Sequence, residues 1–229
     1  EIEALKAQAV AARTFVVSRD YQVDDSTASQ VYMDDTQLQA VWKEQYEASR
    51  SRVQEAVEAT RGEIMTYEGE PITAFFFASS GGHTASSEEY YSDALPYLRS
   101  VDSPWDAAVD SDHVSELTCT KAELAAALGM SGAEKIETPV LYDSGYVKSV
   151  TIDGRAFSGR AIREALQLRS SCFTITVQGD NVTFIVAGSG HGVGMSQEGA
   201  QGMALEGYDY KEILTHYYTG ISFANVYKS

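Results

Sequence analysis

Ten consecutive residues near the end of the chain combine four alternating glycines with side chains that form hydrogen bonds. They read Gly188-Ser189-Gly190-His191-Gly192-Val193-Gly194-Met195-Ser196-Gln197. Glycines at alternate positions disfavour a regular strand or helix, and they let the backbone approach a ligand closely. A β-rich run precedes this loop and a helical pattern follows it, which is a common setting for a binding site. A purely structural turn with an exposed His191 is the alternative interpretation.

The loop does not fit the common glycine-rich motifs of nucleotide-binding proteins and hydrolases. A P-loop needs Lys followed by Ser or Thr after its last glycine, whereas Ala200 follows Gly199 here. The dinucleotide fingerprint needs a third glycine where Val193 stands. A nucleophile elbow needs a glycine two residues after its serine, and Glu198 occupies that position.

A second glycine-rich turn, residues 78–84, follows the β-rich run 72–77. Both turns therefore follow a predicted strand and carry small polar side chains. If the two strands end at the same edge of a sheet, the turns form one continuous floor for a ligand. The residues expected to bind that ligand are Ser79, Ser80, His83, Ser196 and Gln197.

No pattern of metal ligands is present in the sequence. The four histidines, His83, His113, His191 and His216, lack ligand spacing, and His-Glu-x-x-His does not occur. Cys119 and Cys172 are far apart, with no metal-binding spacing around either. We therefore expect no metal and no cofactor. The two thiols are either separately buried or, in an exported protein, joined as a disulfide.

Composition narrows the class of protein. The 229 residues suffice for one sizeable core or two small ones, and 44% are hydrophobic. The net charge of −16 argues against nucleic-acid binding and against adhesion to anionic lipid. No apolar run approaches the length of a membrane span. No signal peptide is recognisable, and because Glu1 begins inside a helical pattern we interpret the chain as part of a longer one.

Helices and strands alternate without a regular βαβ rhythm, so we predict an α+β fold. We expect a single mixed domain over residues 1–229, with β-hairpins, several short helices and long irregular segments that line a cleft. Helices are expected over 2–17, 37–60, 120–129, 158–168, 196–207 and 209–220. Strands are expected over 30–32, 64–67, 72–77, 147–152, 173–177 and 182–186. Residues 85–118 are irregular but rich in Tyr and Trp, a composition that suits sugar stacking or ordinary core packing.

Arg13 lies at the edge of the apolar face of the first helix. Ile2, Leu5, Ala9, Ala12 and Val16 share that face, and Arg13 falls about 60° from its centre. Such an arginine either extends along the surface or holds a cation at the wall of a cleft.

Four segments, in the same order over nearly the whole chain, resemble the stage II sporulation protein D family. They are Glu3-Ala4-Leu5-Lys6-Ala7-Gln8-Ala9-Val10-Ala11-Ala12-Arg13-Thr14-Phe15, Ser79-Ser80-Gly81-Gly82-His83-Thr84, Pro96-Tyr97-Leu98-Arg99-Ser100-Val101-Asp102-Ser103-Pro104-Trp105, and Gly190-His191-Gly192-Val193-Gly194-Met195-Ser196-Gln197-Glu198-Gly199-Ala200. The tail, residues 210–218, is also similar to the family's.

The resemblance implies a peptidoglycan lytic transglycosylase that prefers glycan strands already stripped of stem peptides. Such an enzyme cuts between N-acetylmuramic acid and N-acetylglucosamine without water. One carboxylic acid protonates the glycosidic oxygen, and its carboxylate then takes the proton of the muramyl C6 hydroxyl, which closes an anhydro ring. A single residue therefore serves as both acid and base, unlike the paired carboxylates of the hydrolases.

The resemblance also implies which residues form the site. The cleft residues that match are Arg13, Tyr97 and Arg99, and His191 is expected to donate to a sugar hydroxyl or to orient the acid. The two arginines are expected to pair with lactyl carboxylates. The family's catalytic Glu lies in a Glu-Met-Pro motif ahead of the Ala-rich helix, and this chain begins at Glu1 without that motif. Some family members bind zinc through Cys and His, but segment 23–32 contains neither.

A non-catalytic module is the alternative function, because relatives are described as amidase enhancers and need only bind glycan or a partner. The expected partners are peptidoglycan glycan strands and a cell-wall amidase or other sporulation proteins, with no nucleic acid. The expected location is outside the cytoplasm and facing the cell wall of a bacterium, with the full-length protein membrane-anchored or secreted.

Overall fold

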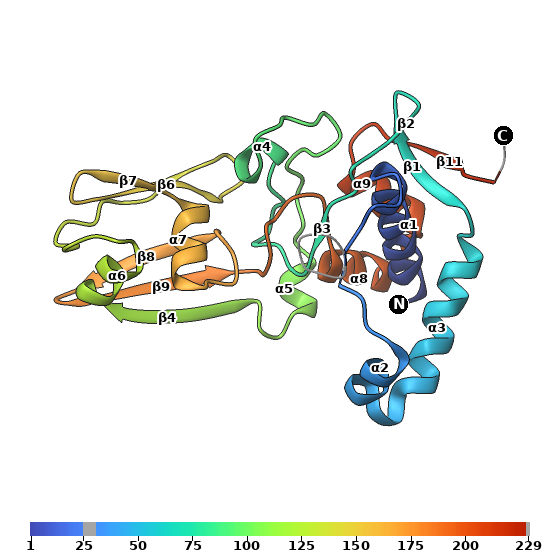
Figure 1. Cartoon of the computed structure of the whole chain (residues 1–229), viewed down its shortest axis with the longest axis horizontal. Helices are drawn as coiled ribbons and strands as arrows, with labels where there is room; N and C mark the ends of the chain where they lie inside the picture. Colours follow the sequence, from blue (N-terminus) through green and yellow to red (C-terminus); the bar gives the residue numbers. More distant parts are fainter. Residues whose placement is uncertain (25–30, 228–229) are drawn as a thin grey trace. The chain divides into compact units, whose positions relative to one another are not determined.

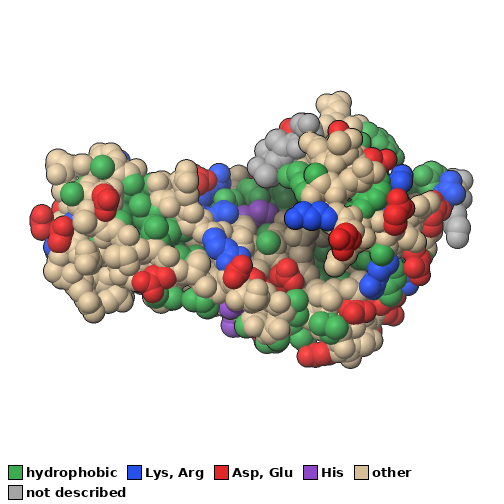
Figure 2. Space-filling model, turned by 90° about the horizontal axis from the view of Figure 1, so that it is seen from below, with side chains coloured by type: hydrophobic (Ala, Val, Ile, Leu, Met, Phe, Trp, Pro, Cys, Tyr) green, Lys and Arg blue, Asp and Glu red, His purple; other side chains and the backbone are tan. Residues whose placement is uncertain are grey.

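The computed structural model describes residues 1–24 and 31–227. The chain forms two compact units, one comprising Glu1–Phe75 with Met203–Ser229 and the other Phe76–Gly202. Both units mix helices with small sheets, which confirms the α+β fold class (Figure 1). The interpretation of residues 1–229 as one domain stays a prediction. Acidic side chains are spread over the visible surface, as the net charge of −16 requires (Figure 2).

The first unit is built around helix α1 (Ile2–Ser18), which packs against α3 (Tyr46–Ala59), β1 (Glu63–Tyr67) and α9 (Tyr210–Tyr217) (Figure 1). The expected apolar face of α1 is not its buried face, since Ile2, Leu5, Ala9, Ala12 and Val16 are only half-buried. The fully buried residues are Ala7, Val10, Ala11, Thr14 and Phe15. Small alanines allow the neighbouring elements to approach closely. Strand β1 lies between β11 (Ser222–Asn225) and β2 (Glu70–Pro71), antiparallel to both.

The single helix expected over 37–60 is wrong. The structure has α2 (Asp35–Trp42), a 3-10 turn η1 (Lys43–Gln45) and α3 instead. The break falls at Lys43, whose φ of 49° is incompatible with a continuous right-handed helix. Neither glycine nor proline marks this position, so no sequence pattern indicates the break.

Two of the expected strands are also wrong in part. Val31 and Tyr32 have no regular structure, and Gln30 lies outside the described residues. The strand expected over 72–77 is reduced to β3 (Phe76–Phe77). The strand that pairs with β1 across the turn is β2, because Glu68 and Gly69 have φ of 52° and 91° and close a two-residue turn before it.

The second unit contains a sheet of β4 (Val114–Thr120), β9 (Asn181–Ala187) and β8 (Phe173–Gln178), in that order. A second sheet has the order β5 (Val140–Leu141), β6 (Val147–Ile152) and β7 (Arg155–Ser158). Helices α6 (Lys121–Ala127) and α7 (Gly159–Leu166) complete the same core (Figure 1). Leu124, Val150, Ile162 and Phe184 are fully buried in it.

Several local predictions are confirmed. Thr120 and Glu123 form the capping box of α6, and Asp209 and Glu212 form that of α9. Strands β8 and β9 form the predicted hairpin, and helix α8 (Gln197–Leu205) follows the loop. The expected irregular segment 85–118 also holds two short helices, α4 (Ser87–Tyr90) and α5 (Asp106–Val109), and the start of β4. In the described part of the chain no helix is both long and apolar enough to span a membrane.

Candidate functional site

The two glycine-rich turns are joined in the second unit by parallel pairing of β3 with β10 (Met195–Ser196). Beyond that pairing, the Ser79 N–H donates to the Ser189 carbonyl at 2.9 Å, and the Ser189 N–H donates to the Ser79 carbonyl at 2.6 Å. The Ala85 N–H donates to the Gly192 carbonyl at 2.7 Å. The segments 78–85 and 188–196, called the joined turns from here on, therefore form one backbone-bonded surface.

The joined turns depend on glycine at positions where another residue would be strained. Gly192 and Gly194 have φ of 85° and 82°, in the left-handed region that favours glycine. A Cβ atom on Gly192 would lie 2.5 Å from the Tyr146 hydroxyl oxygen. Tyr146 is buried, and its hydroxyl takes part in a hydrogen bond with the Gly81 backbone. One rigid phenol therefore contacts both turns.

The buried carboxylate of Asp106 is hydrogen-bonded to both of the joined turns. Its carboxylate accepts from the Ser80 N–H at 2.6 Å, the Ser80 hydroxyl at 3.0 Å and the Ser103 hydroxyl at 2.5 Å. It also accepts a short hydrogen bond from the Ser196 hydroxyl. All four side chains are buried, so the hydroxyls of Ser80 and Ser196 face inward, onto this carboxylate. Their role in substrate binding stays a prediction.

The His191 ring lies among three aromatic rings. Its centroid is 5.6 Å from that of Phe77 and 5.7 Å from those of Tyr90 and Tyr91. Burial, followed by the nearby Arg163 charge, lowers the pKa of His191 to about 4. Its Nδ1 accepts from the Val193 N–H at 3.1 Å, which places the proton of the neutral ring on Nε2. At neutral pH this imidazole is a hydrogen-bond donor without a charge.

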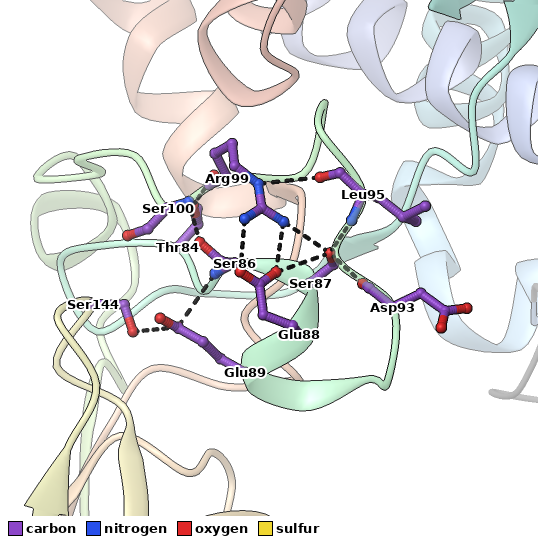
Figure 3. Close-up of polar contacts among 10 residues, drawn as sticks. All are labelled: Thr84, Ser86, Ser87, Glu88, Glu89, Asp93, Leu95, Arg99, Ser100 and Ser144. Atoms are coloured by element: carbon purple, nitrogen blue, oxygen red, sulfur yellow. Dashed lines mark hydrogen bonds and ion pairs between the residues drawn. The ribbon is translucent and has the colours of Figure 1, made fainter.

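Arg99 makes an ion pair within the segment that follows the first turn (Figure 3). Its Nη1 and Nη2 donate to the two carboxylate oxygens of Glu88 at 2.7 and 2.6 Å. This bidentate hydrogen bond lowers the pKa of Glu88 to about 2. Tyr97, two residues earlier in the chain, is half-buried. The sequence pointed to Arg99 but not to the carboxylate that it holds.

Arg13 is bound to the end of helix α3 in the first unit. Its Nη1 donates to the carbonyls of Thr60 at 2.8 Å and Glu63 at 2.9 Å. The Thr60 carbonyl lies at the end of α3, where carbonyls lack partners within the helix, and the Glu63 carbonyl lies at the start of β1. The guanidinium thus joins the end of α3 to the start of β1, and a role for Arg13 in a cleft stays a prediction.

The remaining predicted residues differ in their exposure. His83 is exposed, and its Nε2 lies 3.2 Å from a carboxylate oxygen of Asp102. Ser79 is buried, and its hydroxyl lies 3.4 Å from Nδ1 of His113. Gln197 is exposed at the first position of α8. Substrate binding by these three residues also stays a prediction.

Two carboxyl groups near the joined turns were missed by sequence reasoning. Burial, followed by the charges of Asp110 and Asp106, raises the pKa of Glu198. Burial also raises the pKa of Glu89, although the Ser144 hydroxyl donates to it at 2.5 Å. A carboxyl with a raised pKa can carry a proton toward neutral pH, as a general acid must. Glu198 directly follows the polar end of the loop, and that position was the available signal.

Within residues 1–24 and 31–227, no three or more His, Cys, Asp or Glu side chains are arranged to hold a metal ion. The absence of metal and cofactor stays a prediction. Cys119 and Cys172 are free thiols, each half-buried, and burial raises the pKa of both. The alternative of separate thiols therefore describes this structure.

Comparison with known proteins identifies the family. Residues 1–67 match the family described as "Stage II sporulation protein". The chain is 41% identical to stage II sporulation protein D of Bacillus subtilis over 95% of this chain and 67% of that protein. It is 40% identical to stage II sporulation protein D of Bacillus amyloliquefaciens over 96% of this chain and 67% of that protein.

A more distant relative has a different name. The amidase enhancer of Bacillus subtilis is 29% identical over 96% of this chain and 37% of that protein. The match covers 67% of each of the two sporulation proteins, in contrast to 37% of the amidase enhancer. All four segments that resemble the family lie within residues 3–200 of this chain. The chain therefore belongs to the stage II sporulation protein D family.

Proposed function

We propose that this chain is the transglycosylase portion of a sporulation protein that acts on the cell wall. Its substrate would be a peptidoglycan strand stripped of stem peptides, cleaved between N-acetylmuramic acid and N-acetylglucosamine to leave anhydro-muramyl ends. The observation that carries the proposal is the family membership, which extends over 95% of the chain.

The chemistry of the joined turns supports this proposal. A polymer of sugar rings is bound through hydroxyl and amide groups, and the exposed amide side chain of Gln197, directly after the joined turns, is a group of this kind. Burial lowers the pKa of His191 to about 4, so its imidazole is uncharged near neutral pH, and its hydrogen bonds with the Val193 N–H and the Phe76 backbone hold the ring in place.

The proposed reaction needs a general acid to protonate the glycosidic oxygen. In the family the acid precedes the segment that matches α1, so the test uses the chain extended to the length of its relatives. Within the described residues, Glu198 is the carboxyl beside the loop whose pKa is raised. If Glu1–Ser229 alone cleaves glycan, Glu198→Gln is the variant that should abolish the reaction.

The deciding experiment treats peptide-stripped glycan strands with the extended protein and measures product masses. Anhydro-muramyl ends lie about one water (~18 Da) below the hydrolysis products, because the C6 hydroxyl replaces water as the nucleophile. Anhydro products support the proposal, and hydrolysis products contradict it. His191→Ala should reduce the rate if the loop contacts the substrate.

A glycan-binding module that assists an amidase is the second candidate. The observation that favours it is the 29% identity to an amidase enhancer over 96% of this chain. Binding of stripped strands without any product, together with a faster amidase reaction when the protein is added, would establish the module and exclude the transglycosylase.

A further inference from the structure

The guanidinium of Arg99 is oriented by groups other than its ion-pair partner (Figure 3). Its Nε donates to the Leu95 carbonyl at 3.1 Å, and its Nη2 donates to the Ser87 hydroxyl at 3.0 Å. Ser87 is itself fully buried and fixed, because its hydroxyl donates to the Asp93 carbonyl at 2.7 Å and accepts from the Leu95 N–H at 2.8 Å. These contacts fix the plane of the guanidinium whether or not Glu88 is present.

The outer edge of this guanidinium has the geometry of a carboxylate receptor. Nη1 and Nη2 donate in parallel to the two oxygens of Glu88, at 2.7 and 2.6 Å. A planar fork of this kind matches carboxylates specifically, whereas an amide offers it only one oxygen. Glu88 is an ordinary flexible side chain in the first turn of the four-residue helix α4, and its side chain is 40% exposed. It can leave the fork by rotation into solvent.

We propose that the Arg99 fork is a binding site for the carboxylate of an acidic sugar and that Glu88 is its resident competitor. The identity of the sugar rests on the proposed function. In a peptide-stripped strand the lactyl group of muramic acid ends in a free carboxylate, whereas in a peptide-bearing strand the same carbon forms an amide. Glu88 then occupies the place that the lactyl carboxylate takes when a stripped strand binds.

An internal competitor lowers the apparent affinity of a ligand, because only the fraction of molecules in which the competitor has left the site can bind it. Exposed ion pairs contribute little, because water screens them, and a bidentate pair lies at the upper end of that range. Removing the competitor should therefore strengthen carboxylate binding about fivefold. Since the pKa of Glu88 is about 2, its carboxylate stays ionised at neutral pH, and the exchange is between two carboxylates.

The test compares Glu88→Gln with the wild type in the extended protein. The probe is N-acetylmuramic acid, with N-acetylglucosamine as the sugar that lacks the carboxylate. The readout is the NMR signal of the Arg99 Nε–H, which reports on the fork directly. We expect N-acetylmuramic acid alone to move this signal, with an affinity about fivefold higher in Glu88→Gln. In Arg99→Ala combined with Glu88→Gln the Arg99 signal is absent, so its affinity is measured by titration calorimetry beside Glu88→Gln, and it should show no gain over the wild type.

Glu137→Gln is the matched control, because it removes one exposed carboxylate from another ion pair in the same unit, that with Lys135. It should leave the affinity unchanged. Glu88→Asp, which keeps the charge but is shorter, tests the geometry of the pair if the Gln variant loses its fold. It should also raise the affinity.

Two outcomes overturn the proposal. Unchanged or weaker binding in both Glu88 variants would mean that Glu88 orients Arg99 and does not compete with the ligand. An Arg99 signal that N-acetylmuramic acid does not move in any variant would mean that the fork is not a receptor. Neither outcome depends on glycan cleavage, so failure of the proposed function, seen as absent anhydro products, is measured separately.

Discussion

Replacing Gly192 by Ala should strongly destabilise the second unit. Gly192 has φ of 85°, and an alanine in the left-handed region costs about 1–2 kcal/mol. The new Cβ would also lie 2.4 Å from the Cζ atom of Tyr146, a ring with 3% exposure that cannot rotate away. Overpacking of this kind costs about 1–3 kcal/mol. We expect the free energy of unfolding to fall by about 2–5 kcal/mol.

Gly82→Ala is the matched control for this substitution. Gly82 lies in the other turn and has φ of 106°, but a Cβ there would meet no atom within 4 Å. It should lose the backbone contribution alone, about 1–2 kcal/mol. The two variants should therefore differ by about 1–3 kcal/mol, or about 2–12 °C in melting temperature for a chain of this size.

Urea unfolding, followed by circular dichroism and by tyrosine fluorescence, measures both variants. Tyr146→Leu in the Gly192→Ala background provides a second check, because a smaller, flexible side chain leaves room for the methyl group. The penalty of Gly192→Ala should then shrink, which a double-mutant cycle quantifies. If Gly192→Ala costs no more than Gly82→Ala, or if the penalty is the same without the Tyr146 ring, the close approach of Tyr146 to the loop is refuted.

Three further predictions concern polar groups. Asp106→Asn should lower the free energy of unfolding by about 2–4 kcal/mol, because one acceptor oxygen remains for four buried donors. Asp112→Asn, at an exposed position, is the control and should leave urea unfolding unchanged. Arg13→Lys should cost about 1–2 kcal/mol in the same measurement, since a lysine ammonium cannot replace both Nη1, which donates to the Thr60 and Glu63 carbonyls, and Nη2, which donates to the Val57 carbonyl. An unchanged midpoint would contradict this role. The folded-state pKa of His191, about 4, lies below that of the unfolded chain, so the unfolded state binds more protons between about pH 6.5 and 4. The free energy of unfolding should therefore fall by at most about 3 kcal/mol as the pH decreases through that window. His191→Gln should lose this part of the pH dependence of the unfolding midpoint, and an unaltered dependence would refute the burial of a neutral imidazole.

Local signals predicted the secondary structure well where the chemistry of a cap or turn determines it. Thr120 with Glu123 and Asp209 with Glu212 satisfy the free N–H groups of a first helical turn, so their spacing alone indicates a helix start. The break at Lys43 could not be predicted, because a positive φ at a lysine carries no mark in the sequence. The pairing of β3 with β10 joins residues more than a hundred positions apart, which periodicity also cannot indicate.

The sequence predicted where the candidate site lies better than it predicted what each of its side chains does. The pattern correctly selected the two turns that come together, and two of its alternating glycines, Gly192 and Gly194, have the positive φ that favours glycine. It could not show that the hydroxyls of Ser80 and Ser196 are turned inward, because the acceptor that holds them, Asp106, lies in a third segment. Burial of a polar side chain is a tertiary property, and a run of Ser and Gly has the same composition whichever way its hydroxyls face.

The direction of these side chains separates two tasks within the joined turns. Buried hydroxyls on a buried carboxylate make a stiff support, since each group left without its partner would cost about 1–3 kcal/mol. Two groups stay accessible. Gln197 is exposed at the start of the helix that follows the joined turns. The Arg99 guanidinium, in the segment after the first turn, is held by the Leu95 carbonyl. A sugar polymer is bound by many weak contacts, and these gain affinity only when their positions are fixed before the ligand arrives. For the proposed glycan strand, a rigid polar surface of this kind would be better suited to holding the sugars in register than to binding them tightly.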